Sequence, residues 1–355
     1  MQKYTNLLFG FMLFAACNSS TQEQSATQEK EEEAQAEATS YQTTGSIERI
    51  SEKLNEVVPP DAQLEILAEG YEWTEGPVWI PQGNYLLYSD IPPNSIFKWK
   101  EGEGASLYLK PSGFTGENFE GREPGSNGLI LDDQGRLVLC QHGDRRIARM
   151  TAPLDEPAPQ FETIVDSYQG KRLNSPNDLA YLSNGDLYFT DPPYGLPGGA
   201  DSEAKELDFQ GVYRYSEDNN ELVLLTDELS RPNGIGFSPN GETLYVANSD
   251  PERAIWMAYD VNEEGNIENG RVFYDATDKT GDEPGLPDGF AVHSGGYLFA
   301  TGPGGVWVFS PEGEHLGTLK TGQATANCTF NADESVLYIT ADMYLMRIVL
   351  KGEAS

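Results

Sequence analysis

Apolar and polar positions recur along this chain in six similar segments. Each segment starts with a polar residue, continues as a short apolar strand, passes through a turn that usually contains glycine and returns as a second apolar strand. The apolar residues alternate with the period of half-buried β-strands and not at helical spacing. The pattern predicts an all-β protein in which helix is scarce.

The polar residue of each segment holds the same place in all six copies. These equivalent residues are Glu75, Asn127, Asn177, Asn233, Asp288 and Asn327. They are separated by 52, 50, 56, 55 and 39 residues, which is the period of a four-stranded propeller blade with outer loops of variable length. Six copies predict a six-bladed β-propeller. Because the repeat leaves no second core, we expect one globular domain in the 355 residues.

The N-terminus has the features of an export signal. Lys3 gives a positive start, residues 7–16 are apolar, and Phe14-Ala15-Ala16-Cys17 resembles a cleavage site that ends on cysteine. We expect residues 1–17 to be a lipoprotein signal peptide with Cys17 lipidated. That anchor would place the protein at the cell envelope, on a bacterial membrane and facing the periplasm or the exterior. An ordinary secretory signal or a short uncleaved anchor is the alternative, although so short an apolar stretch cannot span a bilayer.

An acidic segment rich in Ser, Gln and Glu follows the signal. Up to about residue 45 it has almost no large apolar side chains, so it cannot bury enough surface to offset the entropy of ordering. We expect residues 18–60 to form a flexible, disordered tether and residues 61–355 to form the propeller.

Charge and cysteine content narrow the setting further. The formal net charge is −34 with only three histidines, which excludes a nucleic-acid partner because such a partner requires a basic face. Two interpretations of this charge stay open: it keeps the protein soluble, or it attracts divalent cations to the propeller mouth. Cys140 and Cys328 fall in segments that are not neighbours in the ring, so we expect two buried free thiols and no disulfide.

Propeller topology brings two sets of polar residues to one rim. The innermost strand of each blade begins at the rim to which the second strand returns, so the six equivalent residues meet those that end the second strands. The second set is Asp90, His142, Asp191, Asn248, Asp250 and Asp342. So many polar groups around a narrow channel cost several kcal/mol unless something pairs them, and a hard cation would do so.

Four of these residues form a candidate metal site. Glu75 and Asp288 supply carboxylates, and Asn177 and Asn233 supply amide oxygens, the ligand types that Ca²⁺ takes. Zn²⁺, Mn²⁺ or Mg²⁺ would also be accepted by oxygen ligands. Asn or Asp before Gly is also an ordinary turn former, which is the alternative interpretation. The same placement in six copies, including the poor turn former Glu75, favours a central polar site.

Several stretches around these residues resemble a known family. The matching stretches include Glu75-Gly76-Pro77-Val78-Trp79, Ser175-Pro176-Asn177-Asp178, Asp191-Pro192-Pro193-Tyr194-Gly195, Ser230-Arg231-Pro232-Asn233-Gly234 and Leu286-Pro287-Asp288-Gly289. They resemble the senescence marker protein (regucalcin)/gluconolactonase family of six-bladed propellers, in particular its bacterial gluconolactonase branch. The resemblance runs from about Leu64 to Ile348.

The resemblance implies roles for individual residues. The metal-binding glutamate of the family matches Glu75, its two asparagines match Asn177 and Asn233, and its aspartate, which binds metal and is proposed as the base, matches Asp288. The animal members place an arginine two positions before the equivalent of Asn177, where this chain has a serine.

Four residues are therefore candidates for binding substrate. They are Asn127, Asn177, Tyr194 and Arg172, although Arg172 is not aligned with the arginine of the animal members. Tyr194 either stacks on a sugar ring or packs its loop.

The function that this implies is metal-assisted hydrolysis of a cyclic ester, with glucono-1,5-lactone and gluconate as the favoured substrate and product. The cation would polarise the carbonyl group and Asp288 would accept the proton of the attacking water. His142 or Asp191 would share that role, because a metal-bound aspartate is less basic. Alternatively, His142 is structural and bonded to Asp144 or Arg145. We expect a small-molecule sugar lactone as partner, membrane contact only through the lipid anchor, and a monomer or dimer.

Other functions remain open at this point. The same site would suit another lactone, an aryl ester or an organophosphate, and a non-catalytic ligand-binding propeller is a further alternative. The sequence has no Gly-x-Ser-x-Gly nucleophile motif. Residues 111–125 are expected to form a flap over the same rim.

Overall fold

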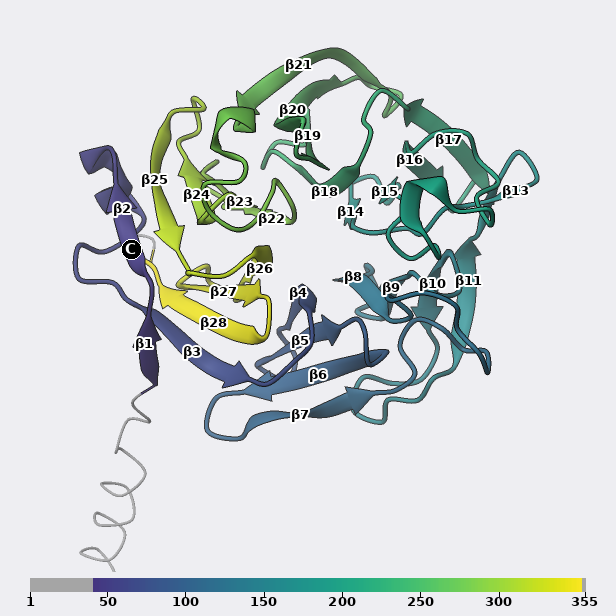
Figure 1. Ribbon diagram of the computed structural model, residues 1–355, viewed down its shortest axis with the longest axis horizontal. Helices are drawn as coiled ribbons and strands as arrows, with labels where there is room; N and C mark the ends of the chain where they lie inside the picture. The colour runs from purple at the N-terminus through teal and green to yellow at the C-terminus, as the bar shows by residue number, and fades with distance from the viewer. Residues whose placement is uncertain (1–40, 353–355) are drawn as a thin grey trace, which may run out of the picture. The chain divides into compact units, whose positions relative to one another are not determined.

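The strands of this protein form six antiparallel sheets around a common axis, each with its first strand near the centre of the ring (Figure 1). The computed structural model describes residues 41–352. The expected all-β, six-bladed propeller is confirmed. Within the described residues, helix is limited to three short 3-10 turns: η1 (Glu52–Glu56), η2 (Gly199–Asp201) and η3 (Thr277–Lys279).

The first four blades are each continuous in sequence. Blade 1 contains β4 (Thr74–Ile80), β5 (Tyr85–Asp90), β6 (Ser95–Lys100) and β7 (Gly104–Leu109); blade 2 contains β8 (Ser126–Leu131), β9 (Leu137–Gln141), β10 (Arg146–Met150) and β11 (Phe161–Val165); blade 3 contains β14 (Leu179–Tyr181), β15 (Leu187–Asp191), β16 (Gly211–Ser216) and β17 (Glu221–Thr226); blade 4 contains β18 (Pro232–Phe237), β19 (Thr243–Asp250), β20 (Arg253–Val261) and β21 (Ile267–Asp275). A small ribbon of β12 (Ser167–Tyr168) and β13 (Lys171–Arg172) joins blades 2 and 3.

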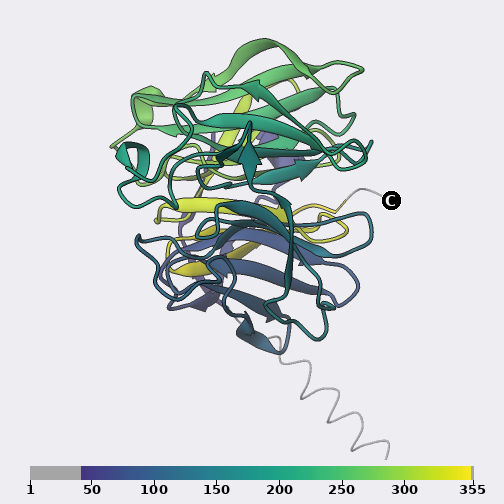
Figure 2. The same ribbon diagram turned by 90° about the vertical axis from the view of Figure 1, so that its right-hand side faces the viewer.

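The last two blades are completed by strands from the N-terminal part of the domain. Blade 5 contains β22 (Phe290–Val292), β23 (Leu298–Gly302), β24 (Gly305–Phe309) and β25 (His315–Lys320), with β2 (Ser46–Arg49) outside them; blade 6 contains β26 (Thr325–Phe330), β27 (Val336–Ala341) and β28 (Tyr344–Val349), followed by β3 (Leu64–Glu69) and β1 (Gln42–Thr44). N-terminal strands in purple therefore lie beside C-terminal strands in yellow (Figures 1 and 2). This pairing closes the ring, because a blade left open would expose unpaired backbone groups.

The propeller begins earlier than the sequence suggested. Residues 41–60, which we assigned to the tether, form β1, β2 and η1, and both Leu54 within η1 and Val58 after it are fully buried. The composition hid these strands because β1 and β2 are outer strands that leave most of their side chains exposed. The expected lipoprotein signal (1–17) and the remainder of the expected tether (18–40) lie outside the described residues.

Leu54→Ala is expected to lower the free energy of unfolding by about 2–5 kcal/mol, because it leaves a cavity in the core between blades 5 and 6. Denaturant unfolding of this variant measures the effect. Ile50→Ala is the matched control, since that side chain is 58% exposed, and should change stability by less than about 0.5 kcal/mol. Equal stability of the two variants would show that η1 does not belong to the folded domain.

The hydrophobic core is divided among the six blade interfaces. Each buried apolar cluster combines side chains of two neighbouring blades, and the last joins blade 6 to blade 1. Cys140 and Cys328 belong to two of these clusters, and both are buried free thiols as expected. The buried apolar side chains therefore pack between neighbouring blades, and polar side chains line the central channel.

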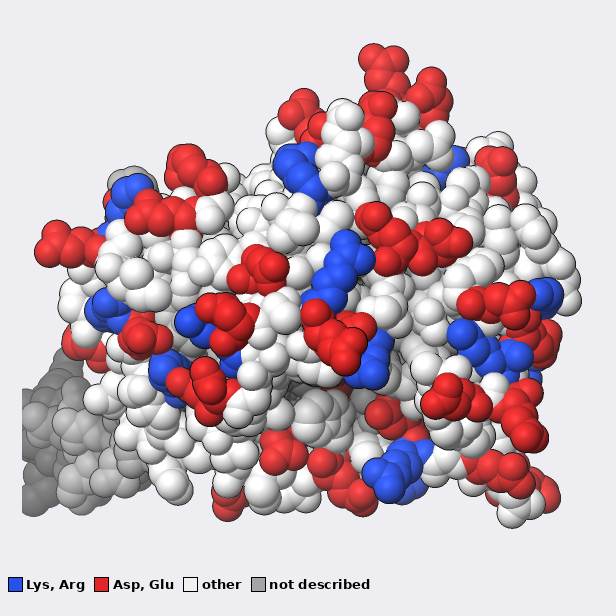
Figure 3. Space-filling view, turned by 45° about the horizontal axis from the view of Figure 1, so that its top comes forward, with Lys and Arg blue, Asp and Glu red and all other residues white. Residues whose placement is uncertain are grey.

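Acidic side chains spread over the visible face of the protein with Lys and Arg among them, and do not gather in one patch (Figure 3). No helix in residues 41–352 is long and apolar enough to cross a membrane.

Candidate metal and substrate site

The six equivalent polar residues stand where the innermost strands are irregular. In blades 1, 2, 4 and 6 the pairing with the second strand shifts at or next to this residue. In blades 3 and 5, Asn177 and Asp288 lie just before β14 and β22. Such bulges and strand starts turn a side chain out of the regular alternation. The repeat therefore aims these side chains at the channel and not at a blade interface.

Hydroxyl groups on the second strands fix the backbone of the next blade's site residue. Ser89 donates to the Asn127 carbonyl at 2.9 Å, and Thr190 donates to the Asn233 carbonyl at 2.7 Å. Glycine permits this close approach, because a Cβ on Gly76 would lie 2.0 Å from the Asn127 carbonyl oxygen. Each blade thus positions the metal-site candidate of its neighbour.

A cavity of about 310 Å³ lies at one end of the channel. Six of the residues singled out in the sequence line it: Glu75, Asn127, Asn177, Asn233, Asp288 and Tyr194. The structure therefore brings together all four expected metal ligands and three of the four expected substrate-binding residues. Asn327, the sixth equivalent residue, does not line the cavity. Its side chain bonds the carboxylates of Glu75 and Asp178 instead.

The expected convergence of the second set on the cavity is wrong, because none of its six members lines it. Three of them instead bond the segment that leads into a site residue. Asp90 accepts hydrogen bonds from the backbone N–H groups of Glu72 and Trp73 at 3.1 and 3.0 Å, and Asn248 accepts one from Arg231 at 2.8 Å. Asp90, Asn248 and Asp191 are thus structural support for the first set.

Asp191, expected to share the proton-accepting role, belongs to this supporting set. It is fully buried, and its two oxygens accept hydrogen bonds from the backbone N–H groups of Asn174 and Ser175, both at 2.8 Å. Burial raises its pKa to about 7, although the two N–H donors act in the opposite direction. The carboxyl group does not reach the cavity.

Asp191→Asn is expected to flatten the pH dependence of stability between about pH 4 and 7. The folded-state pKa of Asp191 lies above the unfolded value of about 3.9, so the folded protein keeps a proton that the unfolded chain has lost. The free energy of unfolding therefore falls as pH rises through this window, by at most about 1.4 kcal/mol per pH unit. Denaturant unfolding at several pH values measures the slope. Asp208→Asn, at a side chain that is 97% exposed, should leave the slope unchanged. Equal slopes for all three proteins would contradict this role.

Two buried acids face each other in the cavity. Burial raises the pKa of Glu75 to about 8, with the charges of Asp178 and Glu123 adding to the shift. Burial and the charge of Glu75 raise the pKa of Asp288 well above its usual value. Two negative charges held at this depth are unfavourable unless a cation neutralises them.

The donor set fits a hard cation. The Oδ1 atoms of Asn127 and Asp288 are buried and have no hydrogen-bond partner among the described residues, so both are free to coordinate. Within residues 41–352 no group of three or more His, Cys, Asp or Glu side chains is arranged to bind a metal. Any cation here must therefore use amide oxygens beside the two carboxylates, which is the mixture that calcium accepts.

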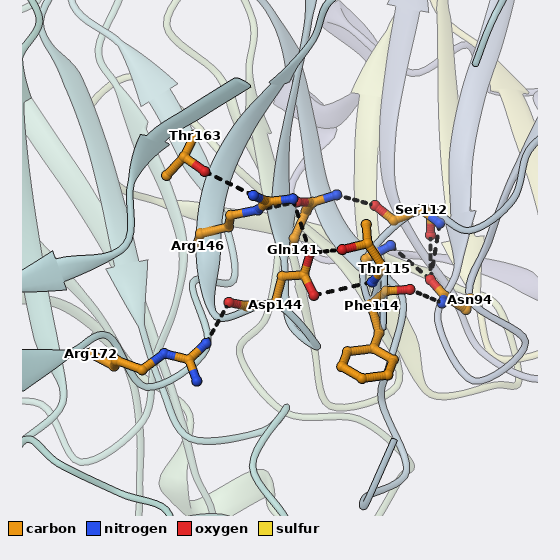
Figure 4. A network of polar contacts seen from close by, with 10 residues as sticks. Asn94, Ser112, Phe114, Thr115, Gln141, Asp144, Arg146, Thr163 and Arg172 are labelled. Atoms are coloured by element: carbon orange, nitrogen blue, oxygen red, sulfur yellow. Dashed lines mark hydrogen bonds and ion pairs between the residues drawn. The ribbon is translucent and has the colours of Figure 1, made fainter. Parts of the chain in front are cut away.

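His142 does not reach the cavity either. It is fully buried, and its Nδ1 lies 3.1 Å from Oε2 of Glu123, so neither Asp144 nor Arg145 is its partner. Arg172 is exposed, and its guanidinium donates to the Asp144 carbonyl at 2.8 Å, away from the cavity (Figure 4). Its expected contact with substrate is therefore wrong.

The sequence analysis missed two charged residues that line the cavity, Glu123 and Arg231. Arg231 stands two positions before Asn233, the same offset at which the sequence analysis looked for an arginine before Asn177. Searching that offset in every repeat would have found it. Glu123 lies in an irregular loop, where no periodic pattern marks single residues.

The cap loop, residues 111–125, is tied to the propeller at both ends. At its start, Asn94 and Asp144 bind backbone groups of residues 112–115, and Gln141 donates to the Ser112 carbonyl at 2.7 Å (Figure 4). At its end, Gly125 donates to the Ile91 carbonyl at 3.1 Å. The loop is thus bonded to the propeller at both ends, and it contributes Glu123 to the cavity lining. Its role as a flap stays a prediction.

The sequence itself matches a known family over most of the domain. Residues 73–342 match the family described as SMP-30/Gluconolactonase/LRE-like region. The chain belongs to this family. The match confirms the resemblance inferred from the short stretches.

Among relatives of this SMP-30/gluconolactonase family member, a gluconolactonase of Zymomonas mobilis is 38% identical over 315 residues, covering 87% of each chain. A pentonolactonase of Haloferax volcanii is 27% identical and covers 75% of this chain and 80% of its own.

Solved structures agree with the family assignment. A gluconolactonase of Xanthomonas campestris has 31% sequence identity and a TM-score of 0.74, with 87% of this chain and 97% of that chain covered. A calcium-binding regucalcin of Agrobacterium tumefaciens has 17% identity and a TM-score of 0.62, covering 81% and 94%, and supports the fold alone.

Proposed function

We propose that this protein hydrolyses a sugar lactone with the help of a bound calcium ion, and that glucono-1,5-lactone is a substrate. One structural observation carries the proposal: a single cavity collects two carboxylates and three asparagine side chains from five different blades. The family assignment and the gluconolactonase of Zymomonas mobilis support the choice of substrate class.

The residues of the cavity have different roles in the proposed reaction. Glu75, Asn177, Asn233 and Asp288 would hold the cation, and Asn127 would complete the ring of oxygen donors. When bound, calcium supplies Lewis-acid polarisation of the lactone carbonyl. Asp288 lines the cavity and its Oδ1 has no hydrogen-bond partner within residues 41–352, so it is placed to accept a proton from the attacking water. The ring C–O bond then breaks and yields the hydroxy acid.

The charged residues that line the cavity suit a polyhydroxylated ring. Arg231 offers donors and Glu123 offers acceptors, and an aryl ester or an organophosphate has no hydroxyl group to donate to Glu123. Tyr194 lies beside Asp288 and Ser249, where its ring is placed to stack on the sugar. These features favour a sugar lactone over the other substrates of the same site.

Proton release from glucono-1,5-lactone near pH 6.5 tests the proposal. The purified protein is assayed after chelation and again after calcium is added, and the spontaneous rate is subtracted. Acid production that requires the metal supports sugar-lactone hydrolysis. Stabilisation by calcium without hydrolysis of this lactone or of pentonolactones would mean that the substrate is wrong. Neither stabilisation nor hydrolysis would favour a ligand-binding propeller.

We further propose that the enzyme works at the cell envelope, held by a lipid on Cys17. The positive start at Lys3, the apolar residues 7–16 and the small residues before Cys17 support this location. Incorporation of labelled fatty acid into the wild-type chain but not into Cys17→Ser tests it.

A further inference from the structure

Glu123 is a carboxylate of the cap loop that reaches the cavity. Its side chain is 32% exposed and lines the cavity together with Arg231 and Tyr194. The charges of Glu123 and Arg231 both act on the Tyr194 hydroxyl, with opposite effects on its pKa. The carboxylate of Glu123 and the guanidinium of Arg231 therefore lie close to the ring of Tyr194.

The imidazole of His142 contacts the carboxylate of Glu123. Its imidazole is fully buried, and Nδ1 bonds Oε2 of Glu123, while Nε2 has no partner among the described residues. An N–H at Nε2 would be a buried donor with nothing to bind, so the proton is better placed on Nδ1, from which it is donated to Glu123. Within residues 41–352, the only polar contact of this ring is thus the one to Glu123.

The position of His142 is itself fixed by close packing. Its backbone N–H donates to the Gly125 carbonyl at 3.2 Å, which ties it to the end of the cap loop. A Cβ on Gly195 would lie 2.7 Å from the His142 Cβ, and one on Gly143 would lie 2.5 Å from the Phe114 Cβ. The backbone and the Cβ of His142 are therefore packed between the 191–195 loop and the cap loop, and its imidazole is fully buried.

We propose that Glu123 is a substrate-binding residue that recognises ring hydroxyl groups, and that His142 is the positioning residue that holds it. The inference rests on the proposed lactonase function and adds its basis of specificity. A carboxylate with one oxygen on His142 keeps acceptor capacity for substrate hydroxyls, and Arg231 supplies the complementary donors. A lactone without hydroxyl groups gives Glu123 nothing to bind, so the site favours polyhydroxylated lactones.

The test compares glucono-1,5-lactone with δ-valerolactone, which has the same ring and no hydroxyl groups. Glu123→Gln removes the charge and one acceptor, so kcat/KM for glucono-1,5-lactone should fall about 10- to 100-fold, mainly through KM, as for loss of a charged hydrogen bond. The value for δ-valerolactone should stay within about threefold, as expected for a group that this substrate does not contact. Glu120→Gln, at an exposed position of the same loop, is the matched control and should match wild type on both substrates.

Two substitutions of His142 separate positioning from general structural damage. His142→Leu should reproduce the Glu123→Gln pattern, whereas His142→Asn places an amide N–H near the position of Nδ1 and should restore selectivity. Melting temperature and calcium affinity are measured for each variant, so that a loss of stability or of metal is separated from a loss of selectivity.

Three results would overturn the inference. The first is an equal loss on both lactones, which would assign Glu123 to the chemistry itself. The second is wild-type selectivity in Glu123→Gln. The third is identical behaviour of His142→Leu and His142→Asn. Failure of the wild-type protein on both lactones would instead overturn the proposed function, and this inference with it.

Discussion

Asp288→Asn lowers kcat for lactone hydrolysis by about 10²- to 10⁴-fold, the range that a lost proton acceptor gives. The substitution removes one of the two carboxylates of the proposed metal site and leaves an amide that cannot take the proton of water. It should also weaken calcium binding. Initial rates with glucono-1,5-lactone at saturating calcium, together with calorimetric titration of calcium, separate the two effects.

Asp133→Asn is the matched control for this variant. Asp133 is an exposed residue that follows blade 2's first strand and does not line the catalytic cavity, so its substitution should leave rate and affinity unchanged. If Asp288→Asn kept wild-type kcat at saturating calcium, Asp288 would be a metal ligand only, and the proton acceptor would have to be sought elsewhere in the cavity.

Calcium should stabilise the protein, and more strongly at pH 8.5 than at pH 6. At a free concentration of about 100 Kd it adds about 2.7 kcal/mol to the free energy of unfolding, a rise in Tm on the order of 5 °C. Without metal, the folded-state pKa of Glu75 is raised to about 8, above its unfolded value of about 4.3, so stability is lost as pH rises through this range. Calcium removes that loss, whereas at pH 6 it must first displace a proton.

Thermal unfolding in BAPTA and in calcium at the two pH values measures this dependence. Glu75→Gln should bind calcium more weakly and should lose most of the difference between the two pH values. A calcium effect that is absent, or larger at pH 6, would contradict a cation between Glu75 and Asp288.

The repeat pattern was sufficient to predict the architecture. The alternation of apolar and polar residues within each strand follows from local backbone geometry and from the burial of every second side chain. Both this alternation and the repeat of about 50 residues are visible in the sequence. The start of the domain was not predictable in the same way. Strands β1 and β2 are stabilised by pairing with β3 and β25, which lie elsewhere in the chain, and not by apolar residues of their own.

The candidate site was also predictable from the sequence only in part. Glu75, Asn127, Asn177, Asn233 and Asp288 share one place in the repeat, and five of the six residues at that place line one cavity. His142 and Asp191 were also placed near this rim by topology, and Arg172 by its closeness to Asn177 in sequence, but neither argument tells which way a side chain points. Asp191 turns to two backbone N–H groups, and Arg172 turns to a backbone carbonyl.

The sequence by itself determined the number of blades, the ring of oxygen donors and the family, because each follows from spacing along the chain. Only the tertiary structure decided which polar groups satisfy one another and which are left for a ligand. Glu123 reaches the cavity through a loop whose course depends on contacts between blades, and His142 is buried beside that loop. Hydrogen bonds between residues distant in sequence leave no periodic trace, so this division of roles required the folded chain.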